Sequence, residues 1–300
     1  ETTWQADVVA LRIIEAFTQA RLLVRGRTEQ SERQVEVAHE ALLREWPLLR
    51  DWIADRREAL RLRDRIVTEA NAWVEQGQPA FLLWKHERLT PARALLEEAD
   101  LLEHLEQDSQ VVDFLTPEAD RLLAELAHGG VDHTLREDIG RRLAEIGDPR
   151  PGVGVKNGVP DILWRLIPAG EKVEIKEHGR FKVAPFYMAA YPVTYVQYQT
   201  FLEAKDGYAS AAWWKGLEHE PEPGSQLRRY ANYPADYVSW YDATAFCRWL
   251  SARLGFEIRL PDEWEWQWAA QSARADFTYP WGPEWREGIA NTSEAGINRT

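Results

Sequence analysis

The sequence predicts an α+β protein with an all-α N-terminal half, and three observations lead to this fold class. Apolar residues at helical spacing fill the first half of the 300-residue chain. They stop at a segment rich in proline and glycine, GDPRPGVGVKNGVPD, at residues 147–161. Beyond it, short aromatic stretches and frequent turns replace helical patterns. Two differently built halves are therefore expected.

The first element predicted is a winged helix over residues 1–58. Val9, Ile13 and Phe17 lie on one helical stripe, and a short apolar strand follows at 22–24. After a polar loop, the alternating residues around Val35 form a second strand that can pair with the first as a hairpin. A second helix with a proline step comes next. The order helix, hairpin, helix is typical of a winged helix.

Three further segments complete the predicted organisation. Residues 59–146 are charged, with apolar spacings of three and four, and predict a helical region. Residues 147–160 are predicted as a Pro/Gly linker between independent units. Residues 161–300 predict a mixed α+β domain.

The stretch RLPDEWEWQWAA at residues 259–270 carries conflicting signals. Its alternating tryptophans are typical of a strand, but Asp262 and Glu265 have the spacing of a helix capping box. We predict a helix that starts at Asp262. On this helix Trp264 and Trp268 share one face and Trp266 points the opposite way, and we expect both faces to be buried.

Composition excludes several classes of protein. The net charge of -13 has the wrong sign for a nucleic-acid binder, and no apolar run approaches the length of a membrane span. The single cysteine, Cys247, cannot form an internal disulfide, which indicates a reducing compartment and a cytoplasmic protein. Because Met188 is the only methionine, we expect Glu1 not to be a translation start.

Candidate site residues are few. Cys247 shares a helical face with Phe246 and Leu250, so we expect a buried, inert thiol and assign no catalytic residue. The histidines lack metal-ligand spacing, so no metal site is predicted. No phosphate-binding loop is found, so we expect no cofactor in this chain. The adjacent Trp213 and Trp214 lie in a loop-like stretch and are candidate ligand-binding residues, whereas the other tryptophans are expected to be core.

Residues 35–66, VEVAHEALLREWPLLRDWIADRREALRLRDRI, resemble the segment that follows the nucleotide-binding core in bacterial STAND-class signalling NTPases. This resemblance implies an upstream NTPase module as partner, with a nucleotide bound there. It also implies that His39, followed by an acidic residue, senses the nucleotide phosphates. The alternative is a histidine that caps or packs at the corner between strand and helix.

The second half resembles the formylglycine-generating-enzyme (sulfatase-modifying factor) family. The resemblance implies a C-type-lectin-like fold, and the domain is expected to be incomplete because two later family motifs and the catalytic cysteines are absent before Thr300. The matching motifs are IPAGE (167–171), YPVTYVQYQTF (191–201), VSWYDATAFCRWLSARLG (238–255), RLPDEWEWQWAA (259–270) and YPWG (279–282).

Together these resemblances imply a non-catalytic, ligand-sensing and regulatory portion of a STAND-type signalling NTPase. The lectin-like domain would be a binding scaffold for an unknown protein or small molecule, with a surface that retroelements diversify in some bacterial systems. The alternative is an enzyme that generates formylglycine, or a related oxidase. DNA recognition by the winged helix ranks last, because Glu40, Glu45 and Asp51 place acid on its second helix.

Overall fold

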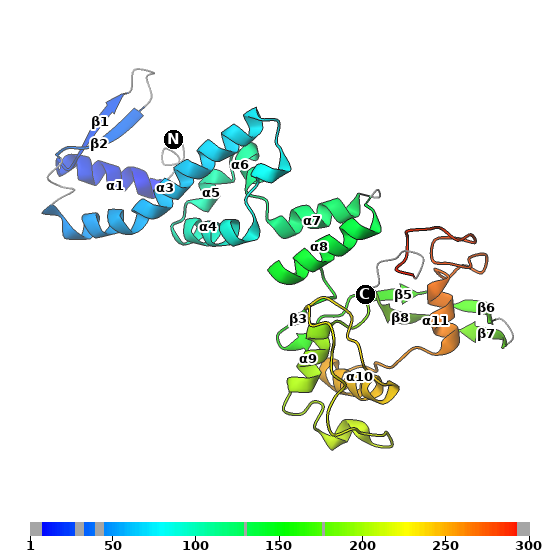
Figure 1. Cartoon of the computed structure of the whole chain (residues 1–300). Helices are drawn as coiled ribbons and strands as arrows, with labels where there is room; N and C mark the ends of the chain where they lie inside the picture. Colours follow the sequence, from blue (N-terminus) through cyan, green and yellow to red (C-terminus); the bar gives the residue numbers. More distant parts are fainter. Residues whose placement is uncertain (1–7, 28–32, 40–44, 129–130, 176–177, 293–300) are drawn as a thin grey trace. The chain divides into compact units, whose positions relative to one another are not determined.

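A computed structural model describes five stretches of the chain, and contacts between residues divide it into two units, Glu1–Thr116 and Pro117–Thr300 (Figure 1). The described residues are 8–27, 33–39, 45–128, 131–175 and 178–292. The N-terminal unit is helical apart from one hairpin, and the second unit mixes helices with small sheets. The predicted α+β class is confirmed.

The first unit begins with the predicted helix and hairpin. Helix α1 (Val8–Gln19) is followed by β1 (Leu23–Arg27) and β2 (Arg33–Val37), which pair antiparallel with Leu23 opposite Val37. The ring of Phe17 on α1 meets that of Trp46 edge-on at 6.1 Å. The motif residues Glu40, Ala41 and Leu42, where the second helix was predicted to begin, lie outside the described residues.

The rest of this unit packs around one long helix, α3 (Pro47–Glu75). The predicted boundary between residues 58 and 59 falls inside α3, so the winged-helix element and the helical region share a continuous helix. Phe114 is central to the core, with the rings of Trp73 and Trp84 each 5.8 Å away. The shorter helices are η2 (Ala80–Leu82), α4 (His86–Glu98), α5 (Leu102–Leu105) and α6 (Ser109–Phe114).

The second unit starts earlier than the sequence indicated, with a helical hairpin of α7 (Glu118–Ala127) and α8 (His133–Ile146). Arg142 on α8 donates to both carboxylate oxygens of Glu118 on α7, at 2.7 and 2.9 Å. The spacing of apolar residues could not separate these helices from the N-terminal ones, because it reports helix formation and not which core a helix joins.

The segment predicted as a linker, residues 147–160, is folded in this unit. It contains the hairpin of β3 (Val155–Lys156) and β4 (Val159–Pro160), and Val153 is buried. Gly152 has φ +95°, and a Cβ there would lie 2.5 Å from that of Leu163, so glycine is required by a close approach. Pro151, Gly152 and Gly158 lie in turns of this packed corner.

Two antiparallel strand pairs and four helical elements form the remainder. The pairs are β5 (Trp164–Ile167) with β8 (Phe186–Ala189), and β6 (Gly170–Ile175) with β7 (Gly179–Val183). The larger of the two hydrophobic cores is built on α9 and α10, and the smaller lies between β6, β7 and α11. The helices are α9 (Tyr195–Glu203), η3 (Ala211–Trp214), α10 (Trp240–Leu254) and α11 (Glu263–Ala270).

Helix α11 confirms the prediction made from the tryptophan stretch. Asp262 is its N-cap, and the capping box with Glu265 is present. Trp264 stacks on Phe181 at 4.9 Å, and Trp268 is buried. The expected burial of the opposite face is wrong, because Trp266 is 59% exposed.

Candidate functional site

A groove of about 910 Å³ lies in the second unit. We call it the aromatic groove. Strands β5 and β8 supply one part of its lining, α10 a second, and residues 256–261 with α11 a third. Its lining includes Trp164, Phe186, Tyr187, Leu250, Phe256 and Trp266.

Several rings in the aromatic groove are open to solvent. Tyr187 is 65% exposed, and Trp266 and Phe256 are also exposed. Trp164 holds Phe256 by an edge-on ring contact at 5.9 Å. Exposed aromatic rings around a cavity bury a large apolar area when a ligand covers them, so this lining favours ligands with an aromatic or aliphatic body.

One ion pair lies in the otherwise largely apolar lining. Arg259 donates to both carboxylate oxygens of Glu265, at 2.8 and 2.7 Å. The backbone N–H of Asp262 also donates to Glu265, at 2.8 Å. The Arg259 hydrogen bonds hold the pKa of Glu265 below its usual range. This carboxylate is therefore a fixed, ionised anchor of α11 and a poor proton donor at neutral pH.

Cys247 on α10 also lines the aromatic groove, but as a buried thiol. Burial raises its pKa to about 11, so the thiol is protonated at neutral pH. No second cysteine exists in these 300 residues. The position of Cys247 is that of a packing residue in the wall, as its helical spacing predicted.

The structure places the two predicted ligand-binding tryptophans elsewhere. Trp214 is only 5% exposed, stacks on His219 at 4.0 Å and donates to the carbonyl of Tyr208 at 2.7 Å. Trp213 is half-buried and bonds through its indole N–H to the carbonyl of Asp206. Neither is among the described residues that line the aromatic groove. The ring of Trp214 is already covered, which leaves Trp213 as the more accessible of the two.

His39 follows β2 at the surface of the first unit. His39 takes part in at least one polar or ring interaction. The acidic residue after it, Glu40, lies outside the described residues. The nucleotide-sensing role of His39 therefore stays a prediction.

Sequence reasoning missed the groove residues Trp266, Tyr187 and Phe256. For Trp266 a signal existed, because it points away from Trp264 and Trp268 on a helix of eight residues. When one face of such a short helix packs into the core, a tryptophan on the opposite face is left at the surface. For Tyr187 and Phe256, no local pattern marks exposure.

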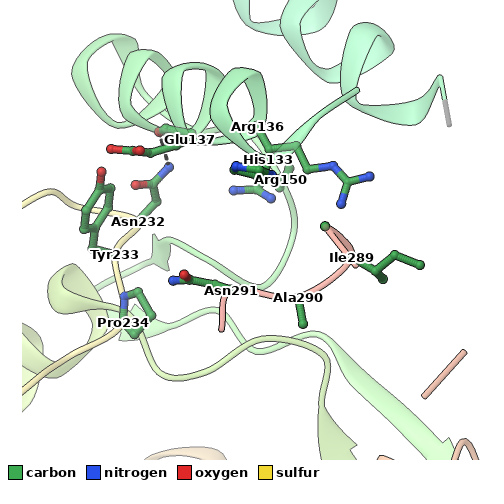
Figure 2. A pocket seen from close by; sticks show the side chains of 12 residues that line it. His133, Arg136, Glu137, Arg150, Asn232, Tyr233, Pro234, Ile289, Ala290 and Asn291 are labelled. Atoms are coloured by element: carbon green, nitrogen blue, oxygen red, sulfur yellow. Dashed lines mark hydrogen bonds between the residues drawn. The ribbon is translucent and has the colours of Figure 1, made fainter. Parts of the chain in front are cut away.

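A second, smaller cavity of about 270 Å³ lies beside α8, and we call it the basic pocket. Figure 2 shows His133, Arg136 and Arg150 close together, with Ile289, Ala290 and Asn291 across the pocket from α8. Asn232 reaches α8 from another loop, and its side-chain N–H₂ donates to the carbonyl of Gly140 at 3.0 Å.

Two negative findings apply to the described part of the chain. It contains no group of three histidine, cysteine or acidic side chains placed to hold a metal ion. None of its helices combines the length and apolar character needed to cross a membrane.

Comparison with known proteins defines the class of each half. Residues 165–299 match the model of the sulfatase-modifying factor enzyme 1-like domain, and residues 2–80 match that of Novel STAND NTPase 1. The chain therefore joins a STAND NTPase-type segment to a domain of the sulfatase-modifying factor type, and the predicted fusion is confirmed.

Curated relatives match the C-terminal family. The chain is 36% identical over 87 residues to inactive C-alpha-formylglycine-generating enzyme 2 of Bos taurus, covering 27% of each protein. It is 38% identical over 106 residues to formylglycine-generating enzyme of Streptomyces coelicolor, covering 29% of this chain and 32% of that protein. With the mouse formylglycine-generating enzyme it shares 28% identity over 161 residues, covering 39% and 41%.

The chain thus spans less than half the length of these relatives. No solved structure gives a significant match.

Proposed function

We propose that this chain is a ligand-sensing and regulatory portion of a STAND-type signalling protein, in which the sulfatase-modifying-factor-like unit is a non-catalytic binding scaffold. The ligand enters the aromatic groove and carries an aromatic or aliphatic body. The proposal includes a C-type-lectin-like fold for the complete domain, a cytoplasmic location and a binding surface of the kind that retroelements diversify.

The aromatic groove is the observation that carries this proposal. A cavity of about 910 Å³ is large enough for a ligand of drug size or for a few peptide side chains. Its exposed rings at Tyr187 and Trp266 offer the area that such a body covers. The ionised pair of Arg259 and Glu265 supplies a polar group that orients a ligand.

The N-terminal unit supports the regulatory part of the proposal. The match to Novel STAND NTPase 1 and the observed helix and hairpin are consistent with a segment that reports to a nucleotide-binding module. That module, with its nucleotide, is the proposed partner. Ligand binding in the second unit then changes how the first unit contacts the module. For this to happen, the ligand must bind one of two conformations of the protein more tightly than the other.

The alternative is a formylglycine-generating or related oxidase, and named relatives of that activity favour it. Within these 300 residues, Cys247 does not supply the reactive thiol that such an enzyme needs. Burial holds the pKa of the Cys247 thiol at about 11, far from the range of a reactive thiolate.

Titration with the neutral apolar fluorophore N-phenyl-1-naphthylamine tests the groove. The folded chain should bind it saturably, and Trp266→Ala should weaken binding by about tenfold, as expected for loss of one aromatic contact. Trp240→Ala is the matched control, because Trp240 is 61% exposed and is not among the described groove residues. Equal weakening by both variants, or no saturable binding, would reject the groove as a ligand site.

A separate assay tests the enzyme alternative. The chain is incubated with a cysteine-containing sulfatase peptide under air, and aldehyde formation is followed with a hydrazine reagent. We expect none above background. Aldehyde formation that Cys247→Ala abolishes would overturn the binding-scaffold proposal.

A further inference from the structure

The basic pocket is separate from the aromatic groove and is built from four parts of the second unit. Helix α8 contributes His133 and Arg136, and the stretch after α8 contributes Arg150. Two later segments, residues 232–234 and 288–291, close the cavity. A ligand in this pocket therefore contacts the α7–α8 hairpin and the sulfatase-modifying-factor-like fold together.

Arg150 is held in a fixed orientation. Its Nε donates to Asp148 at 3.0 Å and its Nη2 donates to the other oxygen at 2.6 Å. The guanidinium also lies over the ring of Tyr191, with 5.4 Å from Cζ to the ring centroid. The Asp148 hydrogen bonds raise the pKa of Arg150, so its charge is permanent. A cation fixed in this way loses little side-chain entropy when it meets an anion.

Asp148 is itself fixed from the other side. Asn232 donates through Nδ2 to Asp148 at 2.8 Å and to the carbonyl of Gly140 at 3.0 Å. Burial raises the pKa of Asp148, but hydrogen bonds from Arg150 and Asn232 outweigh this and keep the pKa below its usual range. The supporting carboxylate is therefore ionised and saturated with donors, and Arg150 keeps its position.

Arg136 provides the accessible charge. It lies on the first turns of α8, is exposed, and lines the same pocket as Arg150 and His133. In Figure 2 these three side chains group together, whereas Glu137 lies nearer to Asn232 and Tyr233. The carboxylate of Glu137 is thus kept away from this group, and the charge of Arg136 is available to an anion, whereas that of Arg150 is already paired with Asp148.

The remaining lining is suited to an organic body. Pro234, Ile289 and Ala290 belong to the segments that line the cavity across from α8. Ile289 is exposed, so a ligand that covers it gains apolar contact. About 270 Å³ accommodates a small metabolite and not a polymer.

We propose that the basic pocket binds a small organic oxyanion, a carboxylate or a phosphate monoester. Its charged group lies between Arg136, Arg150 and His133, and its apolar body lies against Ile289 and Ala290. Arginine binds both kinds of oxyanion through paired N–H groups. The inference does not depend on the aromatic groove, because the two cavities share none of the described residues.

Binding is measured on the full 300-residue chain by isothermal titration and by thermal unfolding. The probes are phenyl phosphate, benzoate and inorganic phosphate, each compared with sodium chloride at the same ionic strength. A ligand that joins α8 to the segment at 288–291 should raise the melting temperature. We expect phenyl phosphate or benzoate to bind more tightly than inorganic phosphate, and the tighter of the two shows which class of oxyanion the pocket prefers.

Three variants test the assignment. Arg136→Gln should weaken binding by about tenfold or more, the usual effect of losing one charge-assisted hydrogen bond. Arg165→Gln, an exposed arginine on β5 outside the pocket lining, should bind as the unmodified chain does. Ile289→Ser should weaken phenyl phosphate and leave inorganic phosphate unchanged.

Two results would overturn the proposal. One is that no probe binds, or raises the melting temperature, more than sodium chloride does at the same ionic strength. The other is that Arg136→Gln and Arg165→Gln reduce affinity equally, because binding would then follow net charge and not this pocket. Circular dichroism of each variant establishes that it is folded, so that a loss of binding is read as loss of the site.

Discussion

The side-chain amide nitrogen of Gln197 lies 2.6 Å from the carbonyl oxygen of Asp161 and donates to it. The same nitrogen lies 3.1 Å from the carbonyl oxygens of Gly152 and Gly154. Gln197 is completely buried at the start of α9, and its Oε1 accepts from the backbone of Thr194 in a capping box. One side chain therefore caps a helix and fastens residues 152–161 to the fold.

Gln197→Ala should destabilise the second unit by about 2 kcal/mol or more, because it leaves buried carbonyl groups without a donor. Urea unfolding followed by tryptophan fluorescence measures the loss. Gln199→Ala on the same helix is the control and should cost less than about 0.5 kcal/mol. Equal losses would mean that the hydrogen bonds of Gln197 contribute nothing specific.

Limited proteolysis gives an independent prediction for the same corner. The unmodified chain should resist cleavage at 150–160, since Val153 is buried and Thr194 donates to its carbonyl at 2.8 Å. Gln197→Ala should open this segment to protease. Rapid cleavage of the unmodified chain there would instead restore the linker interpretation drawn from the sequence.

This corner also shows where sequence reasoning fails. Proline and glycine were interpreted as signs of a linker, but Gly152 is required by its close approach to Leu163. Nothing local to residues 147–160 indicates Gln197, which lies 36 residues or more further along the chain and supplies the anchoring bonds. Turn chemistry can be recognised from sequence, whereas the long-range partner that makes a turn rigid cannot.

Stability should depend on pH through Glu265. Because Arg259 lowers the pKa of Glu265 in the folded state, the stabilisation is present above the unfolded value of about 4.3 and is lost as pH falls through the folded pKa. Glu265→Gln should therefore lower the free energy of unfolding by roughly 1 kcal/mol at pH 7. This value is small because the Arg259 side chain is half exposed to solvent. The effect of the substitution should become progressively smaller below pH of about 4.

The exposed Glu263→Gln on the same turn is the control for this effect. Urea unfolding across the acid range gives the difference in unfolding free energy for each variant. A difference for Glu265→Gln that stays constant down to pH of about 2 would contradict the role assigned to the ion pair.

Cys247 should react slowly with iodoacetamide. With the pKa raised to about 11 by burial, the thiolate population at pH of about 8 is roughly two orders of magnitude below that of an ordinary cysteine. The alkylation rate in native buffer should fall below the rate in urea by at least that factor. Cys247→Ala should cost on the order of 1 kcal/mol. Comparable rates in the two solvents would show a reactive thiol.

The two faces of α11 should respond differently to mutation. Trp268→Ala should cost about 3 to 5 kcal/mol, since it removes a buried ring whose indole N–H donates to the carbonyl of Pro168 at 2.8 Å. Trp266→Ala should cost less than about 1 kcal/mol, because that ring is 59% exposed. Thermal or urea unfolding compares them, and equal costs would refute the assigned orientation of the helix.

Helix α11 illustrates what the sequence does determine. The segment is a helix, as the capping box of Asp262 and Glu265 predicts, and not the strand that the alternating tryptophans suggest. The N-cap is Asp262, as predicted. The caps and the spacing set which residues share a face. They do not set which face is covered, because that depends on β6 and β7 arriving from nearly a hundred residues earlier. For this reason the sequence did not indicate that Trp266 lines the groove.

The measurement closest to the central claim is the response of the tryptophan indole N–H signals to the groove probe, followed by two-dimensional ¹⁵N–¹H NMR. Substitution of each tryptophan by phenylalanine assigns the signals. On addition of N-phenyl-1-naphthylamine, the signals of Trp164 and Trp266 should shift together with one dissociation constant, since both line the aromatic groove. The signals of Trp240 and Trp214 should stay in place. Shifts confined to Trp240 or Trp214, or no saturable shift at Trp164 and Trp266, would contradict a ligand-binding groove in this domain.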